Sequence, residues 1–161
     1  MQNAIRYGLL FALAIFLWAV AETVLGLHGR LIRYHEYLSY FFAVPAVGIM
    51  YRGICAKEKV RGQGMPFRKA FLEGLGITAV VTLLSPAVWY VFCSFVNPVF
   101  LDNMADHAIE AKGMAPPLAM HRYALTNYLF VSTLSTAVIG SVISLVIAII
   151  MAKRRPYREL K

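Results

Sequence analysis

Four long apolar stretches, separated by short polar segments, dominate the pattern of the chain. They run from Tyr7 to about Leu27, from Tyr37 to Ile54, from about Ala70 to Val96 and from about Tyr123 to Ala152. A helix needs about 20 apolar residues to cross a bilayer, and its backbone must be hydrogen-bonded within the segment. The runs are continuous rather than alternating, which excludes a transmembrane barrel. The pattern predicts an all-α polytopic membrane protein with four transmembrane helices.

The start of the first stretch imitates a secretory signal peptide. Arg6 precedes an apolar run, and Ala19-Val20-Ala21 has the small residues of a cleavage site. The apolar run continues past Ala21, so we expect an uncleaved first span.

A short amphipathic helix is predicted between the third and fourth stretches, over residues 98–112. Asn97 fits the N-cap and Pro98 the first helical position. Gly113 is a plausible stop, and Pro116-Pro117 is expected to end any helix. Apolar residues recur between these signals at helical spacing, namely Leu101, Met104, Ala105 and Ala108.

The distribution of basic residues predicts which side of the membrane each loop lies on. The chain has 161 residues, which allows a single membrane domain over 1–161, and 60% of the residues are apolar. Lys and Arg are concentrated near one set of helix ends. Twelve belong to one side of the membrane: Arg6, Arg52, Lys57, Lys59, Arg61, Arg68, Lys69, Lys153, Arg154, Arg155, Arg158 and Lys161. Four belong to the other: Arg30, Arg33, Lys112 and Arg122. Because positive residues favour the cytoplasm, both termini are expected there, and the basic charge needs no nucleic acid to explain it.

Glu22 is the most costly residue of the predicted spans. An acid at the bilayer centre costs about 2.5–3.5 kcal/mol on insertion scales, and less toward the interface. Its helix face carries mostly small residues, namely Gly8, Ala12, Ile15, Ala19 and Gly26. Small residues mark a packing face, so Glu22 is expected to point at other helices. We expect it either to accept a hydrogen bond from a hydroxyl or an arginine, or to form a proton or cation site. The candidate partners are Arg30, Arg33, Thr126, Ser132 and Thr133.

The fourth stretch also carries small and hydroxyl residues at a spacing of four. They are Ser132, Thr136, Gly140, Ser144 and Ala148. Such a stripe permits close approach of another helix, in the same chain or in a partner. Pro45 and Pro86 are expected to kink the second and third helices, and such kinks can flank a binding site in transporters.

No motif for catalysis or for a cofactor is present. All four histidines, His28, His35, His107 and His121, fall near the outer ends of the spans, where acids could join them in a metal site. The histidines have no ligand spacing on one helix, and no nucleophile elbow is found. We therefore expect no metal, no cofactor and no catalytic residue. Cys55 and Cys93 fit no redox or zinc motif.

Several short segments together resemble a known family. They are Asn3-Ala-Ile-Arg-Tyr-Gly, Tyr51-Arg52-Gly53-Ile54, the segment from Gly64 to Gly74 and Phe95-Val-Asn97-Pro98-Val-Phe100-Leu. Their order and spacing resemble the bacterial membrane-protein family known as domain of unknown function 4199. The resemblance implies a small integral protein of the bacterial inner (cytoplasmic) membrane, without an assigned activity or site residues.

Two kinds of function remain open. The first is a non-enzymatic protein that acts through helix packing, as an accessory subunit of a membrane protein or as a homo-oligomer. The second is a small transporter or channel component that uses Glu22 and the proline-kinked helices. Four spans in 161 residues leave little room for a substrate cavity, which favours the first. A membrane-embedded enzyme ranks last.

Overall fold

A computed structural model describes residues 2–56 and 65–153, and these residues form helices and turns without a strand. Four segments are long and apolar enough to cross a membrane: α1 (Gln2–Val24), Ile32–Cys55, Phe67–Val96 and α7 (Leu125–Lys153). The continuous apolar runs produce these helices because the backbone in lipid must satisfy its own hydrogen bonds. The prediction of an all-α, multi-pass membrane protein is confirmed.

The second and third spans are composite helices. The second consists of α2 (Ile32–Ser39), a 3-10 turn η1 (Tyr40–Phe42) and α3 (Ala43–Cys55). The third consists of α4 (Phe67–Val91) and a π-helical segment η2 (Phe92–Val96). Both irregular segments therefore lie within long apolar helices.

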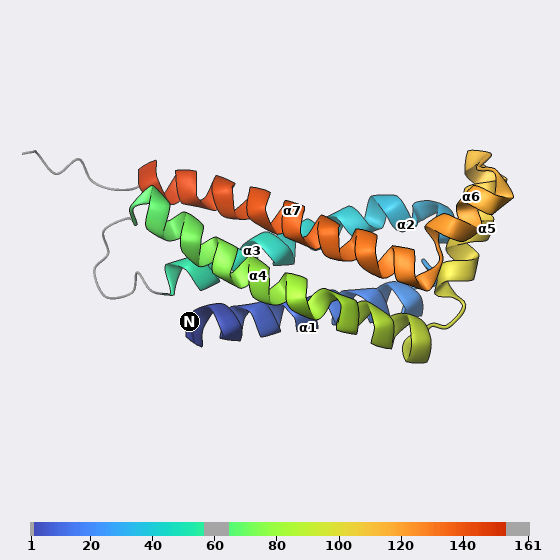
Figure 1. Ribbon diagram of the computed structural model, residues 1–161, viewed down its shortest axis with the longest axis horizontal. Coiled ribbons are helices and arrows are strands. Elements are labelled where there is room, and N and C mark those ends of the chain that lie inside the picture. The colour runs from blue at the N-terminus through green and yellow to red at the C-terminus, as the bar shows by residue number, and fades with distance from the viewer. Residues whose placement is uncertain (1, 57–64, 154–161) are drawn as a thin grey trace, which may run out of the picture.

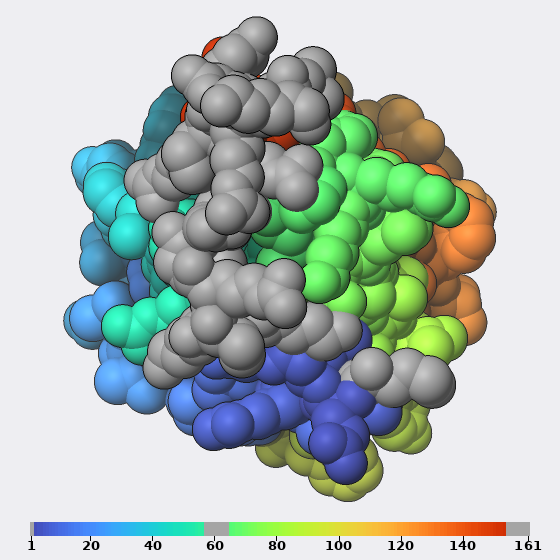
Figure 2. All heavy atoms as spheres, turned by 90° about the vertical axis from the view of Figure 1, so that its left-hand side faces the viewer, coloured from blue at the N-terminus to red at the C-terminus, as the bar shows by residue number. Residues whose placement is uncertain are grey.

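The spans form an elongated bundle with one covered end (Figure 1). Helices α5 (Phe100–Lys112) and α6 (Pro116–Arg122) lie across that end, which we call the capped end. Gln2 and Lys153 both lie at the opposite end, the uncapped end, where the start of α4 is seen above α1 in Figure 2. Seven of the twelve basic residues assigned to the cytoplasm lie outside the described residues: Lys57, Lys59, Arg61, Arg154, Arg155, Arg158 and Lys161.

Helix α4 is the centre of the bundle and contacts α1, α3 and α7. Glycines permit these contacts. A Cβ added at Gly8 of α1 would lie 2.5 Å from Val80 Cγ1, and one at Gly74 would lie 2.6 Å from Ser144. Larger side chains at these positions would push the helices apart, because packed interiors leave no spare volume.

The small-residue stripe of α7 faces α4 of the same chain. A Cβ added at Gly140 would lie 2.7 Å from Thr78 Cγ2. The hydroxyls of Thr78 and Ser144 lie 3.3 Å apart, and those of Ser85 and Thr136 lie 3.4 Å apart. Ser144 and Ala148 are fully buried, and the Ser132 carbonyl accepts a hydrogen bond from Thr136 Oγ1 of the same helix at 2.8 Å. The middle of the stripe is therefore used within the bundle.

The predicted packing face of α1 holds for part of its length. Ala12 and Ala19 are buried, as is Glu22, and Gly8 packs on α4. Gly26 differs from the prediction, because α1 ends at Val24 and Gly26 lies in the following turn with φ +77°. Nothing lies within 4 Å of a Cβ built there, so Gly26 serves the turn and not helix packing.

The prolines lie in different surroundings. Pro86 is inside α4, as expected, and the helix continues to Val91. Pro45 is the third residue of α3, directly after η1. Because α3 continues directly from η1, the missing N–H of Pro45 removes the bond that residue 45 would donate to the carbonyl of Phe41. The irregular part of the second span is thus Tyr40–Phe42, just before Pro45.

Two local predictions near the capped end are wrong. Asn97 does not cap the amphipathic helix, because α5 begins at Phe100 after Val99, without a side-chain cap. Pro116 and Pro117 begin a helix, α6, rather than ending one, since proline fits the first turn. Gly113 does end α5, with φ +65° in the left-handed region.

The interior of the bundle on the side of the uncapped end is apolar. Its buried apolar side chains come from all four spans and pack into one cluster. They include Phe11, Met50, Ile77, Val81, Ile147 and Met151. A second apolar cluster lies beneath α5 and contains Phe92, Cys93, Phe100 and Met104. This second cluster is next to the polar side chains described below.

Candidate functional site

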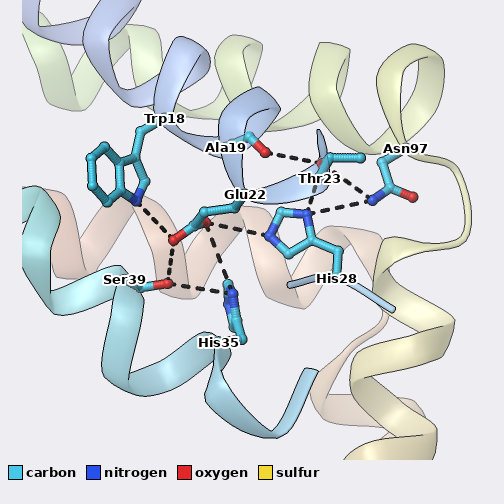
Figure 3. Close-up of polar contacts among 8 residues, drawn as sticks. All are labelled: Trp18, Ala19, Glu22, Thr23, His28, His35, Ser39 and Asn97. Carbon is cyan, nitrogen blue, oxygen red and sulfur yellow. Dashed lines mark hydrogen bonds and ion pairs between the residues drawn. The ribbon is translucent and has the colours of Figure 1, made fainter. Parts of the chain in front are cut away.

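Charged and polar side chains converge at the capped end, around Glu22 (Figure 3). Glu22 lies near the end of α1, His28 in the turn that follows, and His35 and Ser39 on α2. Asn97 approaches from the end of η2. We call the three residues Glu22, His28 and His35 the Glu–His–His cluster; their ligand-type atoms all lie within 4.8 Å of one another.

The two oxygens of the Glu22 carboxylate have different neighbours. Oε1 accepts hydrogen bonds from Trp18 Nε1 at 2.7 Å and from Ser39 Oγ at 2.6 Å. Oε2 faces His28 Nε2 at 3.3 Å and His35 Nδ1 at 3.9 Å. Two donors therefore hold the orientation of the carboxylate and direct Oε2 toward both imidazole rings. Glu22 is 5% exposed, so its charge is directed into the protein and not into lipid.

The turn after α1 places His28 beneath the end of that helix. Leu27 N donates to Glu22 O at 2.9 Å, and Leu31 N donates to Gly26 O at 2.9 Å. The positive φ of Gly26 allows the chain to reverse there without a strained side chain. Leu27 and His28 are each 3% exposed, so the turn carries buried residues rather than a solvated connector.

Hydrogen bonds around His28 assign its tautomer. Thr23 has one hydroxyl proton, which it donates to Ala19 O at 3.0 Å. In the 2.8 Å contact between Thr23 Oγ1 and His28 Nδ1, the ring nitrogen is then the donor. Asn97 Nδ2 donates to Thr23 Oγ1 at 3.5 Å. With the proton on Nδ1, a neutral His28 directs its Nε2 lone pair at Glu22 Oε2, and a protonated His28 donates from Nε2 to that oxygen.

The π-helical segment η2 brings Asn97 to this network. Asn97 N donates to Phe92 O at 2.9 Å, five residues back. This wider turn of helix leaves the Asn97 side chain 7% exposed and beside Thr23 and His28. Single π-helical turns within α-helices are frequent at functional sites.

Aromatic rings enclose the side of the cluster away from α2. The His28 ring lies 4.6 Å from the Phe100 ring and 5.6 Å from the Phe92 ring, measured between centroids. Phe92 and Phe100 are almost fully buried. Trp89 and Tyr128 extend this wall, with their ring centroids 5.3 Å apart. The wall leaves His35, whose side chain is 15% exposed, as the cluster residue nearest to solvent.

Helix α5 is tied to the cluster at two points. Asn103 Nδ2 donates to the His28 carbonyl at 2.7 Å. Lys112, at the end of α5, pairs with Glu36, which follows His35 on α2. The predicted amphipathic helix therefore forms a cover over the buried polar residues.

The partners of Glu22 differ from those predicted. A hydroxyl does bind it, but the hydroxyl belongs to Ser39 and not to Thr126, Ser132 or Thr133. No arginine is among its contacts in the described residues, because His28 and Trp18 take the positions expected for Arg30 or Arg33. The indole N–H of Trp18 lies one helical turn before Glu22, so this pair could have been found from an i, i+4 spacing.

The sequence did not predict this histidine pair as a site, because His28 and His35 have no ligand spacing on one helix. His28 and His35 come from a turn and from a separate helix, and their rings lie 4.9 Å apart. His107 and His121 do not belong to the cluster. The sequence signal was the position of two histidines just after an acid at a helix end.

Comparison with known proteins supports the resemblance noted in the sequence. The profile of the family described as "Protein of unknown function (DUF4199)" matches residues 6–153. No curated protein and no solved structure matches the chain significantly. Because the match covers nearly all of the sequence, the chain belongs to the DUF4199 family of proteins of unknown function.

Proposed function

We propose that the protein is a non-enzymatic subunit of the bacterial inner membrane that works through its capped end, in contact with another membrane protein or with a second copy. The observation that carries this proposal is the docking of α5 onto the Glu–His–His cluster through the bond from Asn103 to the His28 carbonyl. A cover that is fixed to buried polar residues offers a constant surface on one side of the membrane.

The small-residue stripe of α7 is already packed within the chain, so we expect the contact surface elsewhere on the molecule. Gly140 and Ser144 pack against Thr78 and Gly74 within the chain. That part of the stripe is therefore not available to a helix of a partner protein. In contrast, α6 exposes Leu118 and Met120, whose exposed fractions are 57% and 68%. Exposed apolar side chains on a short cap helix suit contact with a protein or with the membrane interface.

The distribution of buried polar groups favours this role over transport. Among the described residues, the buried charged or imidazole groups are Glu22 and His28, both at the capped end. The polar groups buried deeper are hydroxyls of α4 and α7, such as Thr78 and Ser144. A transporter needs polar groups along a route across the membrane, and ionisable residues usually mark that route.

The orientation belongs to the same proposal. Twelve Lys and Arg against four favour cytoplasmic termini, and with that orientation the capped end would lie outside the cytoplasm. Topology reporters fused at residue 161 and inserted within 103–115 should report opposite sides of the membrane. A cytoplasmic signal from the insertion within 103–115 would reverse the orientation and place the cap inside the cell.

Photo-crosslinking in the native membrane tests the contact. A photoreactive residue at Met120 on α6 should give a protein adduct of defined mass. The control is Val138, which is 56% exposed on the lipid-facing side of α7 and should give none. Adducts between two differently tagged copies would indicate a homo-oligomer, and native mass spectrometry in a mild detergent would give the stoichiometry.

The transporter alternative predicts a different result. Purified protein in liposomes would then conduct a cation, and Glu22→Gln would abolish the flux while the protein stays folded. Such a flux, together with no adduct from Met120, would overturn the proposed role.

A further inference from the structure

We propose that Glu22, His28 and His35 bind one divalent transition-metal ion at the capped end, with Zn²⁺ as the representative ion. This inference goes beyond the proposed function, because a subunit that acts through surface contacts needs no metal. The observation behind it is geometric: an acid from α1, an imidazole from the following turn and an imidazole from α2 converge on one point.

The separations between the ligand atoms fit a tetrahedral ion. Zn–N and Zn–O bonds of about 2.0–2.1 Å place neighbouring ligand atoms about 3.3 Å apart in a tetrahedral site. Glu22 Oε2 and His28 Nε2 are 3.3 Å apart. Glu22 Oε2 and His35 Nδ1 are 3.9 Å apart, and all three ligand atoms lie within 4.8 Å of one another, so the His35 ring would have to move toward both other ligands when the ion binds. His35 can make that movement because its side chain is the least buried of the three.

The hydrogen bonds of Glu22 and His28 leave one lone pair of each directed at the proposed ion, and His35 Nδ1 would exchange its 3.4 Å contact with Ser39 Oγ for the ion. In neutral His28, the form that binds metals, Thr23 accepts the Nδ1 proton and the Nε2 lone pair faces Glu22 Oε2. Trp18 and Ser39 both donate to Oε1, which leaves Oε2 of the same carboxylate for the proposed ion. Histidine ligands of metals almost always donate their second ring N–H to an oxygen acceptor, commonly a carboxylate, a carbonyl or water, and Thr23 Oγ1 takes that place here. Either a proton on Nε2 or a metal ion can bridge two acceptors at 3.3 Å, and a metal ion is the occupant that also brings in His35.

The donor set selects the class of metal. Two imidazole nitrogens and one carboxylate suit Zn²⁺ and its first-row neighbours. Ca²⁺ and Mg²⁺ prefer six or more oxygen ligands, and Cu⁺ prefers sulfur. Three protein ligands leave one coordination position, and the partly exposed His35 side lets water reach it.

Direct titration of the purified full-length protein tests the site. The protein carries an affinity tag without histidine, is treated with a chelator and is titrated with ZnCl₂ by calorimetry in detergent, with MgCl₂ as the comparison ion. We expect one equivalent of Zn²⁺ to bind and Mg²⁺ not to bind. Zn²⁺ should also raise the thermal unfolding midpoint, because it binds the folded state.

Variants assign the binding to the cluster. Glu22→Gln keeps an acceptor for Trp18 and Ser39 but removes the charge, and His35→Ala removes a partly exposed ligand. Each should weaken Zn²⁺ binding by more than the roughly 10–100-fold caused by losing a ligand's hydrogen-bond partner. The matched control is His121→Ala, an exposed histidine of the same end, which should bind like the unmodified protein.

Two results would overturn the proposal. One is wild-type protein that takes up no stoichiometric Zn²⁺ and no Co²⁺, the latter followed by its visible absorption, a measurement that needs no variant to fold. The other is unchanged binding by folded Glu22→Gln or His35→Ala protein, which would place the ion elsewhere. Neither result bears on the crosslinks expected from Met120, so the metal site and the contact role can fail separately.

Discussion

The capped end and the α4–α7 interface are held together in different ways. At the interface, neighbouring helices approach at glycine and small hydroxyl residues, and the contacts are neutral. At the capped end, one carboxylate is bound by side chains from α1, the following turn and α2. The first region depends on shape along two helices, while the second depends on several elements meeting at a point. The two regions should therefore respond to different substitutions.

Glu22→Leu should have the largest effect on stability in the absence of metal. It removes the acceptor for the Trp18 indole and the Ser39 hydroxyl and leaves His28 facing an apolar side chain. Each buried polar group left without a partner costs about 1–3 kcal/mol, so the total should reach about 3 kcal/mol or more.

Glu22→Gln is the matched control for that prediction. Gln keeps a carbonyl acceptor near the position of Oε1 and loses only the charge, so the expected loss is about 1 kcal/mol. Thermal unfolding in detergent, followed by circular dichroism in chelator-treated buffer, measures both variants. Equal destabilisation by Leu and Gln would show that charge, and not hydrogen bonding, holds the cluster.

Gly140→Leu should be the next most damaging change, and it acts on the other region. The new side chain would collide with Thr78, which lies 2.7 Å from a Cβ at this position. Overpacking of this kind costs about 1–3 kcal/mol. Ile139→Leu is the control, because Ile139 is 58% exposed and the change should stay within about 0.5 kcal/mol. Similar unfolding midpoints for the two variants would mean that the helices can separate at Gly140 without loss.

The small-residue face of the α4–α7 interface could be predicted from the sequence, because it depends on residues that are close together along one helix. Lipid requires continuous apolar helices, so the four runs predict four spans. Small residues repeated every four positions mark one face of a helix, and Gly140 and Ser144 are indeed packed against α4. Which helix would receive that face was left open, since the spacing contains no information on the partner.

The Glu–His–His cluster could be predicted only in part, because its residues come from separate elements that meet only in the folded chain. The insertion cost of an acid identified Glu22. The partners follow from the reversal at Gly26, from the start of α2 and from the π-helical turn before Asn97. Asn97-Pro98 has the pattern of a helix start, but the Asn97 side chain is used by Thr23 instead of capping α5. A tertiary hydrogen bond replaced the local one that the pattern predicted.

Thr23→Val should have a moderate effect that is confined to the capped end. Thr23 accepts the Nδ1 proton of His28, and valine has the same shape without the acceptor. The expected loss is about 1–2 kcal/mol in apo protein, together with a roughly 10–100-fold weaker Zn²⁺ affinity.

Thr133→Val is the matched control for Thr23→Val. Thr133 is also partly buried and also donates to a carbonyl of its own helix, that of Leu129 at 2.7 Å, but it serves no histidine. Its replacement should change the unfolding midpoint little and leave Zn²⁺ binding unaltered. If the two valine variants behave alike, the assigned His28 tautomer is wrong.

Lys112→Gln should have the smallest effect, although it breaks the only ion pair between α5 and α2 among the described residues. The side chains of Lys112 and Glu36 are 39% and 54% exposed, and exposed pairs contribute about 0–1 kcal/mol.

The bond from Asn103 to the His28 carbonyl is more buried, so Asn103→Ala should destabilise more, by about 1–2 kcal/mol. Unfolding at low and high salt separates the two contributions, because salt screens only the exposed pair. A larger loss for Lys112→Gln than for Asn103→Ala would mean that surface charge holds the cap, and that the buried cluster is not what fixes its position.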